Sequence, residues 1–173
     1  MAKPMLILWT TLVISLVSFK NVSPKEKCES EWKQRPGYAY KRYCSATFDE
    51  AEKTCQAEEG HLVSIHSEEE NQFVRDLIEP LHMEGKENYS NFIWIGLKKD
   101  EKEVWHWVDG TEMNFKKWST GEPNNLENKE GCGQMYTYGV PRHPEGNTYW
   151  NDVWCNRTMR YFVCKTVLII EKL

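Results

Sequence analysis

The sequence predicts one α+β domain, and three observations predict it. Two segments with helical periodicity come early, strand-like segments come mostly later, and a long irregular stretch rich in Gly, Pro, Asn and Glu interrupts the strands. A chain of 173 residues is long enough for one domain with a hydrophobic core. We therefore look for one functional site in one domain.

An apolar run follows Lys3 at the start of the chain, from Met5 to Phe19. Its length and basic flank are typical of a secretory signal peptide rather than a membrane span. We predict a signal peptide over residues 1–19, a secreted extracellular product and no membrane insertion after cleavage. A retained signal anchor is the alternative, because no clean small-x-small pattern marks the cleavage position.

The first helix is predicted after an aromatic strand at residues 38–43. Thr47 with Glu50 three residues later forms a capping box, so the helix begins there. Gly60 is expected to end it. Its buried face is predicted from helical spacing to consist of Phe48, Ala51 and Cys55.

A short strand at residues 62–65 precedes the second helix. Ser67 with Glu70 is a second capping box, and Pro80 stops the helix that starts there. The core stripe of this helix is predicted to be Phe73, Val74, Leu77 and Ile78.

The pattern then changes to strands. Residues 92–97 read as a buried strand, and residues 104–108 as a strand with Trp105 and Trp107 on one face. Strand patterns return at residues 149–154 and 161–164. Residues 118–146 between them show little periodicity, and a loop of that length in a compact domain is usually functional.

Charge and composition narrow the class of ligand. The formal charge of −4 and the absence of a dense Lys/Arg block argue against nucleic acid or an anionic membrane as partner. A neutral or cation-bridged ligand fits better. Eight tryptophans and eight tyrosines supply mainly core packing, and also the flat faces that line sugar sites.

An even number of cysteines follows the export signal, which favours disulfide bonds. Zinc is disfavoured because there is no close Cys-x-x-Cys pair and the histidines lack zinc-finger spacing. The cysteines are Cys28, Cys44, Cys55, Cys132, Cys155 and Cys164. N-glycosylation is expected at the sequons of Asn88 and Asn156, whereas Asn21 is weakened by Pro24.

Oxygen-bearing side chains gather on or beside the long loop. They are Glu122, Asn124, Glu130, Asn151 and Asp152. Calcium takes six to eight oxygen ligands in irregular geometry, so three carboxylates and two carboxamides suit Ca2+ better than softer metals. A cis peptide bond before Pro123 would hold its two neighbours on the same side of the loop.

Together these motifs give a specific resemblance. Glu122-Pro-Asn124, then Glu130 and Cys132, then Trp150-Asn-Asp152, with Trp94-Ile-Gly-Leu97 upstream, resemble the C-type lectin domain family over residues 28–165. The resemblance implies that the five oxygen donors form both the calcium site and the sugar-binding site. It also implies that calcium keeps positions for two adjacent sugar hydroxyls.

The order of the two motif residues predicts the sugar. A carboxylate only accepts hydrogen bonds, whereas an amide also donates. Glu122 before Asn124 resembles the family pattern for mannose, fucose and N-acetylglucosamine, while Gln-Pro-Asp goes with galactose. The predicted partners are therefore mannose-type glycans or glycoproteins.

The resemblance also implies the cysteine pairing, with Cys55 bonded to Cys164 and Cys132 to Cys155. In relatives with an extra hairpin cystine, the second cysteine falls where this chain has Ala39. Cys44 lies five residues further on, roughly 16 Å along a strand. A Cys28–Cys44 pair is the economical assignment, and an interchain bridge is the alternative.

One calcium ion is expected rather than two. Relatives with an auxiliary site carry acidic residues where this chain has Lys98, Lys102, Asn125 and Gly131. Nearby acidic residues would have to shift to replace them.

Two other classes of function compete with sugar binding. One is a lectin-like domain that recognises a protein partner without sugar. The other is a metal-assisted enzyme, which we disfavour because no Ser/His/Asp or Cys/His arrangement stands out. Weak single-site sugar binding would gain from a homo-oligomer, although no collagen or heptad repeat indicates one.

Overall fold

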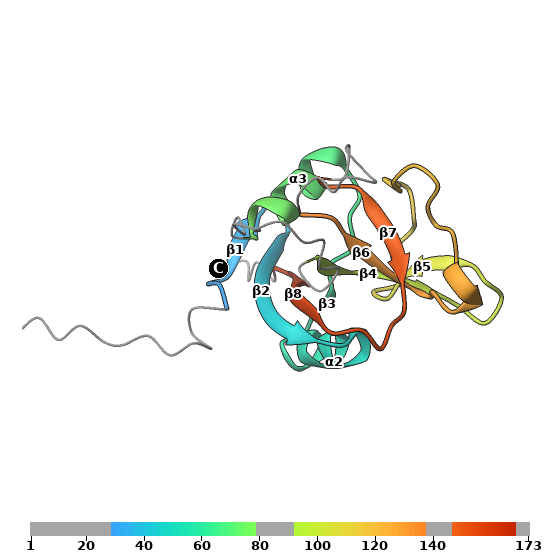
Figure 1. Ribbon diagram of the computed structural model, residues 1–173. Helices are drawn as coiled ribbons and strands as arrows, with labels where there is room; N and C mark the ends of the chain where they lie inside the picture. The colour runs from blue at the N-terminus through green and yellow to red at the C-terminus, as the bar shows by residue number, and fades with distance from the viewer. Residues whose placement is uncertain (1–28, 79–91, 138–146, 169–173) are drawn as a thin grey trace, which may run out of the picture.

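The computed structural model describes residues 29–78, 92–137 and 147–168 (Figure 1). The predicted signal peptide, Cys28, Asn21, Asn88 and Pro80 lie outside these ranges. The elements are β1 (Lys33–Arg35), β2 (Tyr38–Ala46), α2 (Phe48–Ala57), β3 (His61–Leu62), α3 (Glu68–Asp76), β4 (Ile93–Lys99), β5 (Trp105–Trp107), η2 (Leu126–Asn128), β6 (Cys132–Met135), β7 (Trp150–Val153) and β8 (Met159–Val167). Helices and strands together confirm the α+β class.

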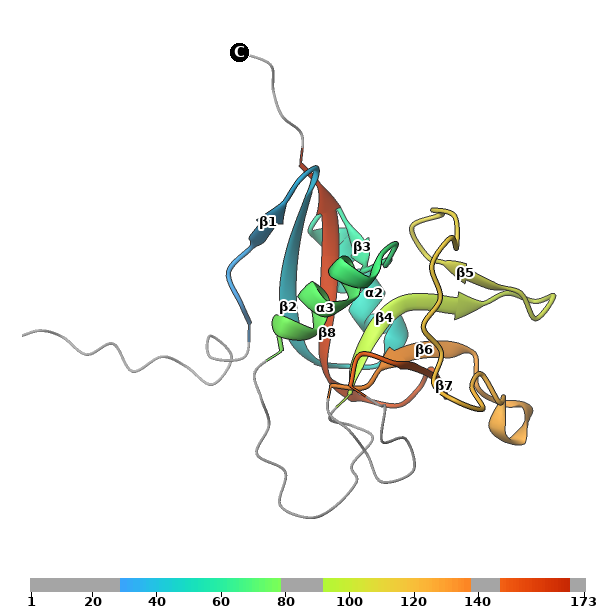
Figure 2. The ribbon, with the colours of Figure 1, turned by 90° about the horizontal axis from the view of Figure 1, so that it is seen from above.

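The described strands form one sheet with the order β1-β2-β8-β4-β6-β7, to which β3 and β5 add at β8 and β4. Most neighbours are antiparallel, but β4 runs parallel to β8. In Figure 1, α2 and α3 lie on opposite sides of the strands. Figure 2 shows β5 and the η2 segment projecting on the side away from β1, so the long loop lies at one end of the domain.

Helix α2 begins as the sequence predicts. Thr47 and Glu50 form both halves of the capping box, and Phe48, Ala51 and Cys55 are buried. The helix ends at Ala57, however, not at Gly60.

The role of Gly60 is packing rather than the left-handed turn, which Glu59 takes with φ 57°. A Cβ on Gly60 would lie 2.5 Å from the Lys165 carbonyl oxygen, so a glycine is needed where the chain passes β8.

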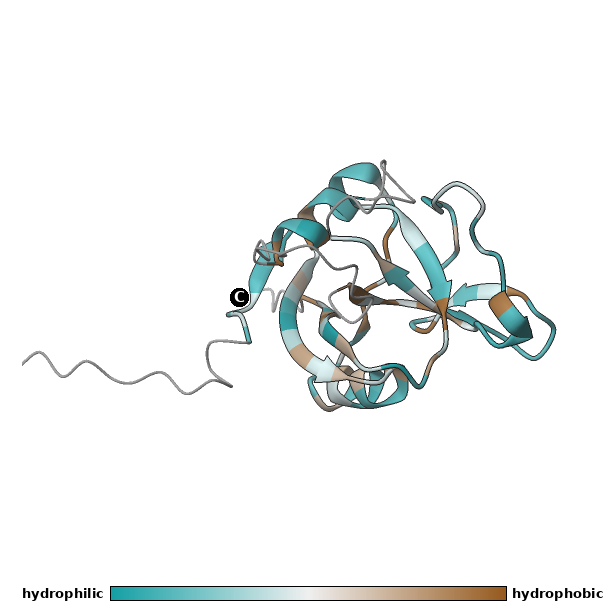
Figure 3. Ribbon diagram, viewed as in Figure 1, coloured by the Kyte–Doolittle hydropathy of each residue, from teal (hydrophilic) through white to brown (hydrophobic). Residues whose placement is uncertain are grey.

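Helix α3 starts at the predicted cap, where Ser67 Oγ accepts from Glu70 N at 3.1 Å. The Glu70 side chain does not return to Ser67, as a full capping box requires. It accepts from His66 N and from Lys165 Nζ instead. The helix surface is mostly hydrophilic (Figure 3), while Val74 and Ile78 enter the core.

The core consists of two clusters of buried side chains, and both contain aromatic rings. Trp94, Trp107 and Trp150 are fully buried. The rings of Trp107 and Trp150 pack edge to face, with 5.5 Å between their centroids. The predicted pairing of Trp105 and Trp107 on one face is confirmed, because both pack in the same cluster.

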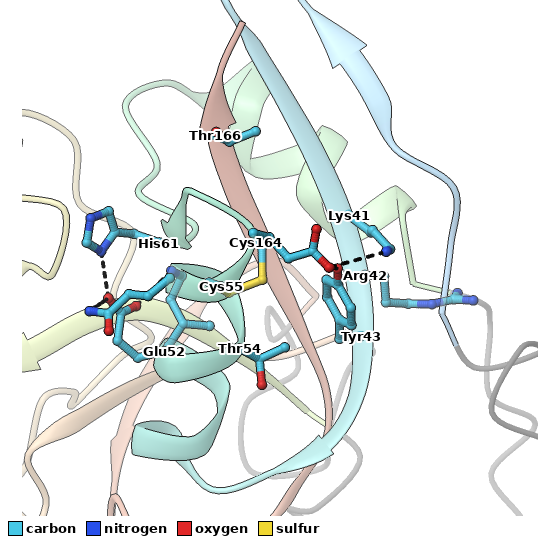
Figure 4. The surroundings of a disulfide bond; sticks show 12 residues. Lys41, Arg42, Tyr43, Glu52, Thr54, Cys55, His61, Cys164 and Thr166 are labelled. Carbon is cyan, nitrogen blue, oxygen red and sulfur yellow. Dashed lines mark hydrogen bonds and ion pairs between the residues drawn. A yellow bond between two sulfur atoms is a disulfide. The ribbon is translucent and has the colours of Figure 1, made fainter.

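The disulfides Cys55–Cys164 and Cys132–Cys155 are both present. The first joins α2 to β8 (Figure 4), and the second joins the start of β6 to the turn after β7. Cys44 is also disulfide-bonded, but the expected Cys28–Cys44 pair lies outside the described residues.

Two strands, β1 and β6, were missed in the sequence. Residues 132–135 fall inside the stretch interpreted as loop, yet they form β6. Cys-Gly-Gln-Met has little intrinsic strand propensity. It is extended because it pairs with β4 on one side and β7 on the other, contacts that local sequence does not reveal.

No helix in the described part of the chain is long and apolar enough to span a membrane.

Candidate functional site

The long loop is fastened to β7 where it begins. Trp150 N donates to the Lys117 carbonyl and Ser119 N donates to the Trp150 carbonyl, each at 2.8 Å. Trp118 forms a parallel bridge with Trp150. The residues just after Ser119 are therefore held beside the strand that carries Asn151.

The Glu122–Pro123 peptide bond is cis. The side chains on either side of it contact each other, since Asn124 Nδ2 donates to Glu122 Oε1 at 3.0 Å. Asn124 N also lies 3.1 Å from Glu122 Oε2. Glu122 is half-buried, and Asn124 is exposed.

Asp152 connects the loop to β7. It is fully buried, and its Oδ1 and Oδ2 accept from Asn124 N at 3.0 Å and from Asn125 N at 2.9 Å. The neighbouring Asn151 is buried as well, and its Nδ2 donates to the Asp152 carbonyl at 2.7 Å. Asp152 thus contacts Asn124 and Asn125, which precede it in the chain by 28 and 27 positions.

Glu130 approaches from the other end of the loop. Its Oε2 accepts from Leu126 N at 2.9 Å. Its backbone N donates to Asn125 Oδ1 at 3.2 Å, so Asn125 contacts both Asp152 and Glu130.

Asn125 belongs to the site, although its residue type was predicted only to mark a lost acidic position of an auxiliary calcium site. It adopts the left-handed conformation (φ 48°, ψ 51°). Asn tolerates that conformation better than other non-glycine residues, and the Asn-Asn pair after a proline was a usable turn signal.

Negative charge is concentrated at the site. Burial raises the pKa of Glu122 to about 7, and both its hydrogen bond with Asp152 and the negative charge of Asp152 contribute to this rise. Burial also raises the pKa of Glu130, with Asp152 adding to the effect and the Arg157 and Lys99 charges opposing it. The site therefore favours a proton or a cation.

The chemistry of the donors fits calcium, because all are carboxylate or carboxamide oxygens around crowded negative charge. Their arrangement is partial. Glu122, Asn124 and Asp152 are in contact, whereas Glu130 is hydrogen-bonded to Leu126 N. Within residues 29–78, 92–137 and 147–168, no group of three or more His, Cys, Asp or Glu side chains is arranged to hold a metal ion. The amide oxygens would therefore have to complete the ligand set.

Two of the three acidic residues that follow β4, Asp100 and Glu103, are already engaged. Lys99 Nζ pairs with Glu103 Oε2 at 2.9 Å, and Asp100 Oδ1 accepts from the backbone N–H of Lys102 and Val104. Lys98 pairs with Asp49 at 3.0 Å. Lysine ammonium groups and backbone donors occupy these carboxylates, and the expectation of one ion rather than two stays a prediction.

A family model and a curated relative both match most of the chain. The model of the lectin C-type domain matches residues 44–166. The C-type lectin lectoxin-Lio1 of Erythrolamprus poecilogyrus is 32% identical over 166 residues, covering 91% of each chain.

Two solved structures share the fold. The carbohydrate-recognition domain of cow CD23, solved in the presence of a GlcNAc2Man3 oligosaccharide, has a TM-score of 0.65 and 26% identity over 80% of this chain and 94% of that one. A calcium-independent type II antifreeze protein has a TM-score of 0.62 and 25% identity over 80% and 92%.

Proposed function

The chain belongs to the C-type lectin domain family, and on that premise we propose that it is a secreted, calcium-dependent lectin for mannose-type sugars. One observation carries the proposal: Asp152 on β7 holds the backbone of Asn124, whose side chain contacts Glu122. Carboxylate and amide oxygens from two distant segments thereby meet at one end of the domain.

The residues that would hold the ion are Glu122, Asn124, Glu130, Asn151 and Asp152. Calcium, when bound, supplies coordination positions for two adjacent sugar hydroxyls.

The side chains themselves complete the recognition. Glu122 would accept a hydrogen bond from one hydroxyl, while Asn124 would donate one to the other through Nδ2. Asn125 would position the loop, because it joins the buried Asp152 to Glu130.

The proposed preference for mannose, fucose and N-acetylglucosamine rests on Glu122 preceding Asn124. The cow CD23 domain, solved in the presence of a mannose-containing oligosaccharide, supports this class of ligand. The disulfides support an oxidising extracellular location. Association into a homo-oligomer would raise avidity and stays a prediction.

A protein partner bound without sugar is the second candidate. The antifreeze neighbour has this fold and is calcium-independent, and the partial arrangement of the described acidic side chains favours a role without calcium. A binding role is proposed over catalysis in both cases. Ser64 does contact Asp109 at 2.5 Å, but Ser64 is fully buried and out of reach of a substrate.

Retention on mannose resin distinguishes the two candidates. We expect the folded protein to be retained in calcium and released by EDTA, and Glu122→Gln to pass through unretained. Glu127→Gln, an exposed neighbour on the same loop, serves as the matched control and should be retained. Equal retention with and without EDTA, or none for the folded wild type, would reject the lectin proposal.

A further inference from the structure

Asn156 lies on an exposed turn directly after β7. Asn156-Arg157-Thr158 is an N-glycosylation sequon, and all three residues are exposed. The turn is closed by a hydrogen bond from Arg157 N to the Trp154 carbonyl at 3.0 Å. An exposed turn of this kind is accessible for attachment of a glycan in an exported protein.

The same turn borders the ligand loop. The Trp154 ring has Lys129 Nζ at 5.3 Å and Arg157 Cζ at 5.4 Å from its centroid. Lys129 directly precedes Glu130 in the chain. Trp154 therefore contacts both Arg157 of the sequon and Lys129 of the segment that carries a candidate calcium ligand.

Two further contacts fix this position. The Cys132–Cys155 disulfide ties the residue before Asn156 to the start of β6. A Cβ on Gly131 would lie 3.6 Å from Cys155 Sγ, so the backbone next to Glu130 touches this turn. The disulfide and the ring contacts hold the turn in place. Asn156 therefore stays close to the loop, and so does the base of a glycan attached to it.

The reach of a glycan covers the site. Asn156 follows Asp152 by four positions in the chain, and even a fully extended chain of that length spans at most about 14 Å. An N-linked glycan is bulky and projects from the surface. Its inner sugars would stand at the rim formed by Lys129 and Arg157.

We propose that Asn156 carries an N-glycan that screens the rim of the ligand site, so that small sugars enter while large glycoproteins and proteases are hindered. The class of ligand rests on the proposed function. The screening itself rests on Arg157 of the sequon, which shares the Trp154 ring with Lys129 and whose charge acts on Glu130.

Two variants at one position test the proposal. Thr158→Ala destroys the sequon, whereas Thr158→Ser preserves it and changes the exposed side chain about as little as possible. Both are produced by secretion from a glycosylating host. Intact mass is measured before and after treatment with PNGase F. We expect Thr158→Ser to lose the mass of one more glycan than Thr158→Ala.

Binding kinetics then test the screening. Affinities for calcium and methyl α-mannoside should be equal in the two variants, while association of an immobilised mannose-rich glycoprotein should be roughly threefold to tenfold faster for Thr158→Ala. Equal masses, or equal association rates, would overturn the proposal. Calcium-dependent self-association that depends on the Asn156 glycan would overturn it in favour of self-recognition.

A protease readout keeps the test independent of sugar binding. In EDTA, trypsin should cleave after Lys129 more slowly in Thr158→Ser than in Thr158→Ala. Equal cleavage rates would reject the screening even if the protein binds no sugar. Failure of both variants to bind methyl α-mannoside, with the difference in cleavage intact, would reject only the lectin function.

Discussion

The indole nitrogen of Trp150 donates a 2.9 Å hydrogen bond to Asn71 Oδ1, across 79 positions of the chain. Both side chains are fully buried, and Asn71 Nδ2 donates to the Thr148 carbonyl at 3.0 Å. Helix α3 thus holds the start of β7 from the core side. The next two residues of that strand, Asn151 and Asp152, are candidate calcium ligands.

Replacing Asn71 with Ala should destabilise the domain by about 3 kcal/mol, because the Trp150 N–H and the Thr148 carbonyl both lose a buried partner. Urea unfolding measures this. Gln72→Ala, which removes an exposed contact with Asp76 on the same helix, is the control and should change little. If Asn71→Ala loses no more stability than the control, Asn71 does not hold the start of β7.

A buried ion pair predicts a pH-dependent stability. Burial alone would raise the pKa of Glu70, but hydrogen bonds from Lys165 and Tyr40 outweigh it and hold that pKa below its ordinary value of 4.5. Glu70 therefore contributes stability above pH 4.5, and the contribution is lost as pH falls through the lowered pKa.

Urea unfolding of wild type and Glu70→Gln across this range is the check. The stability difference should be present at neutral pH and shrink as pH falls below 4.5. Glu101→Gln, on the exposed β4–β5 turn, should show no such trend. A Glu70→Gln difference that stays constant with pH would reject the assignment.

The Cys132–Cys155 disulfide should matter for the loop as well as for overall stability. It closes a segment of 23 residues, and its removal in Cys132→Ala/Cys155→Ala should cost about 3 kcal/mol. Calcium affinity should also fall, because Glu130 lies two residues before Cys132. Denaturation and calorimetry test the two effects, and unchanged calcium affinity in the folded variant would mean that the disulfide does not support the site.

Exchanging the motif side chains should exchange the preferred sugar. Glu122→Gln with Asn124→Asp reverses which side chain can donate a hydrogen bond, so binding should shift from mannose toward galactose. A calcium-dependent glycan array on wild type and double mutant measures it. An unchanged preference would mean that this pair does not select the sugar.

The sequence predicted most of the fold because periodicity and capping are local. The Thr47 and Ser67 caps, the buried face of α2 and the Trp105–Trp107 strand need only neighbouring residues to be recognised. Strand β6 and the close approach of Gly60 to Lys165 depend on partners far along the chain, so local patterns missed them.

The candidate site divides in the same way. Oxygen chemistry and motif order identified Glu122, Asn124 and Asp152, which the fold brings together. The role of Asn125 required tertiary information, since its contacts with Asp152 and Glu130 join both ends of the loop to β7. The hydrogen bond from Leu126 N to Glu130 could not be inferred from residue types either.

Isothermal titration of calcium into the folded, EDTA-stripped protein tests the central claim most directly. We expect saturable heat at one ion per chain, lost in Glu122→Gln and kept in Glu127→Gln. No heat from a protein shown to be folded by circular dichroism would contradict a calcium site at Glu122, Asn124 and Asp152, and with it the proposed sugar binding.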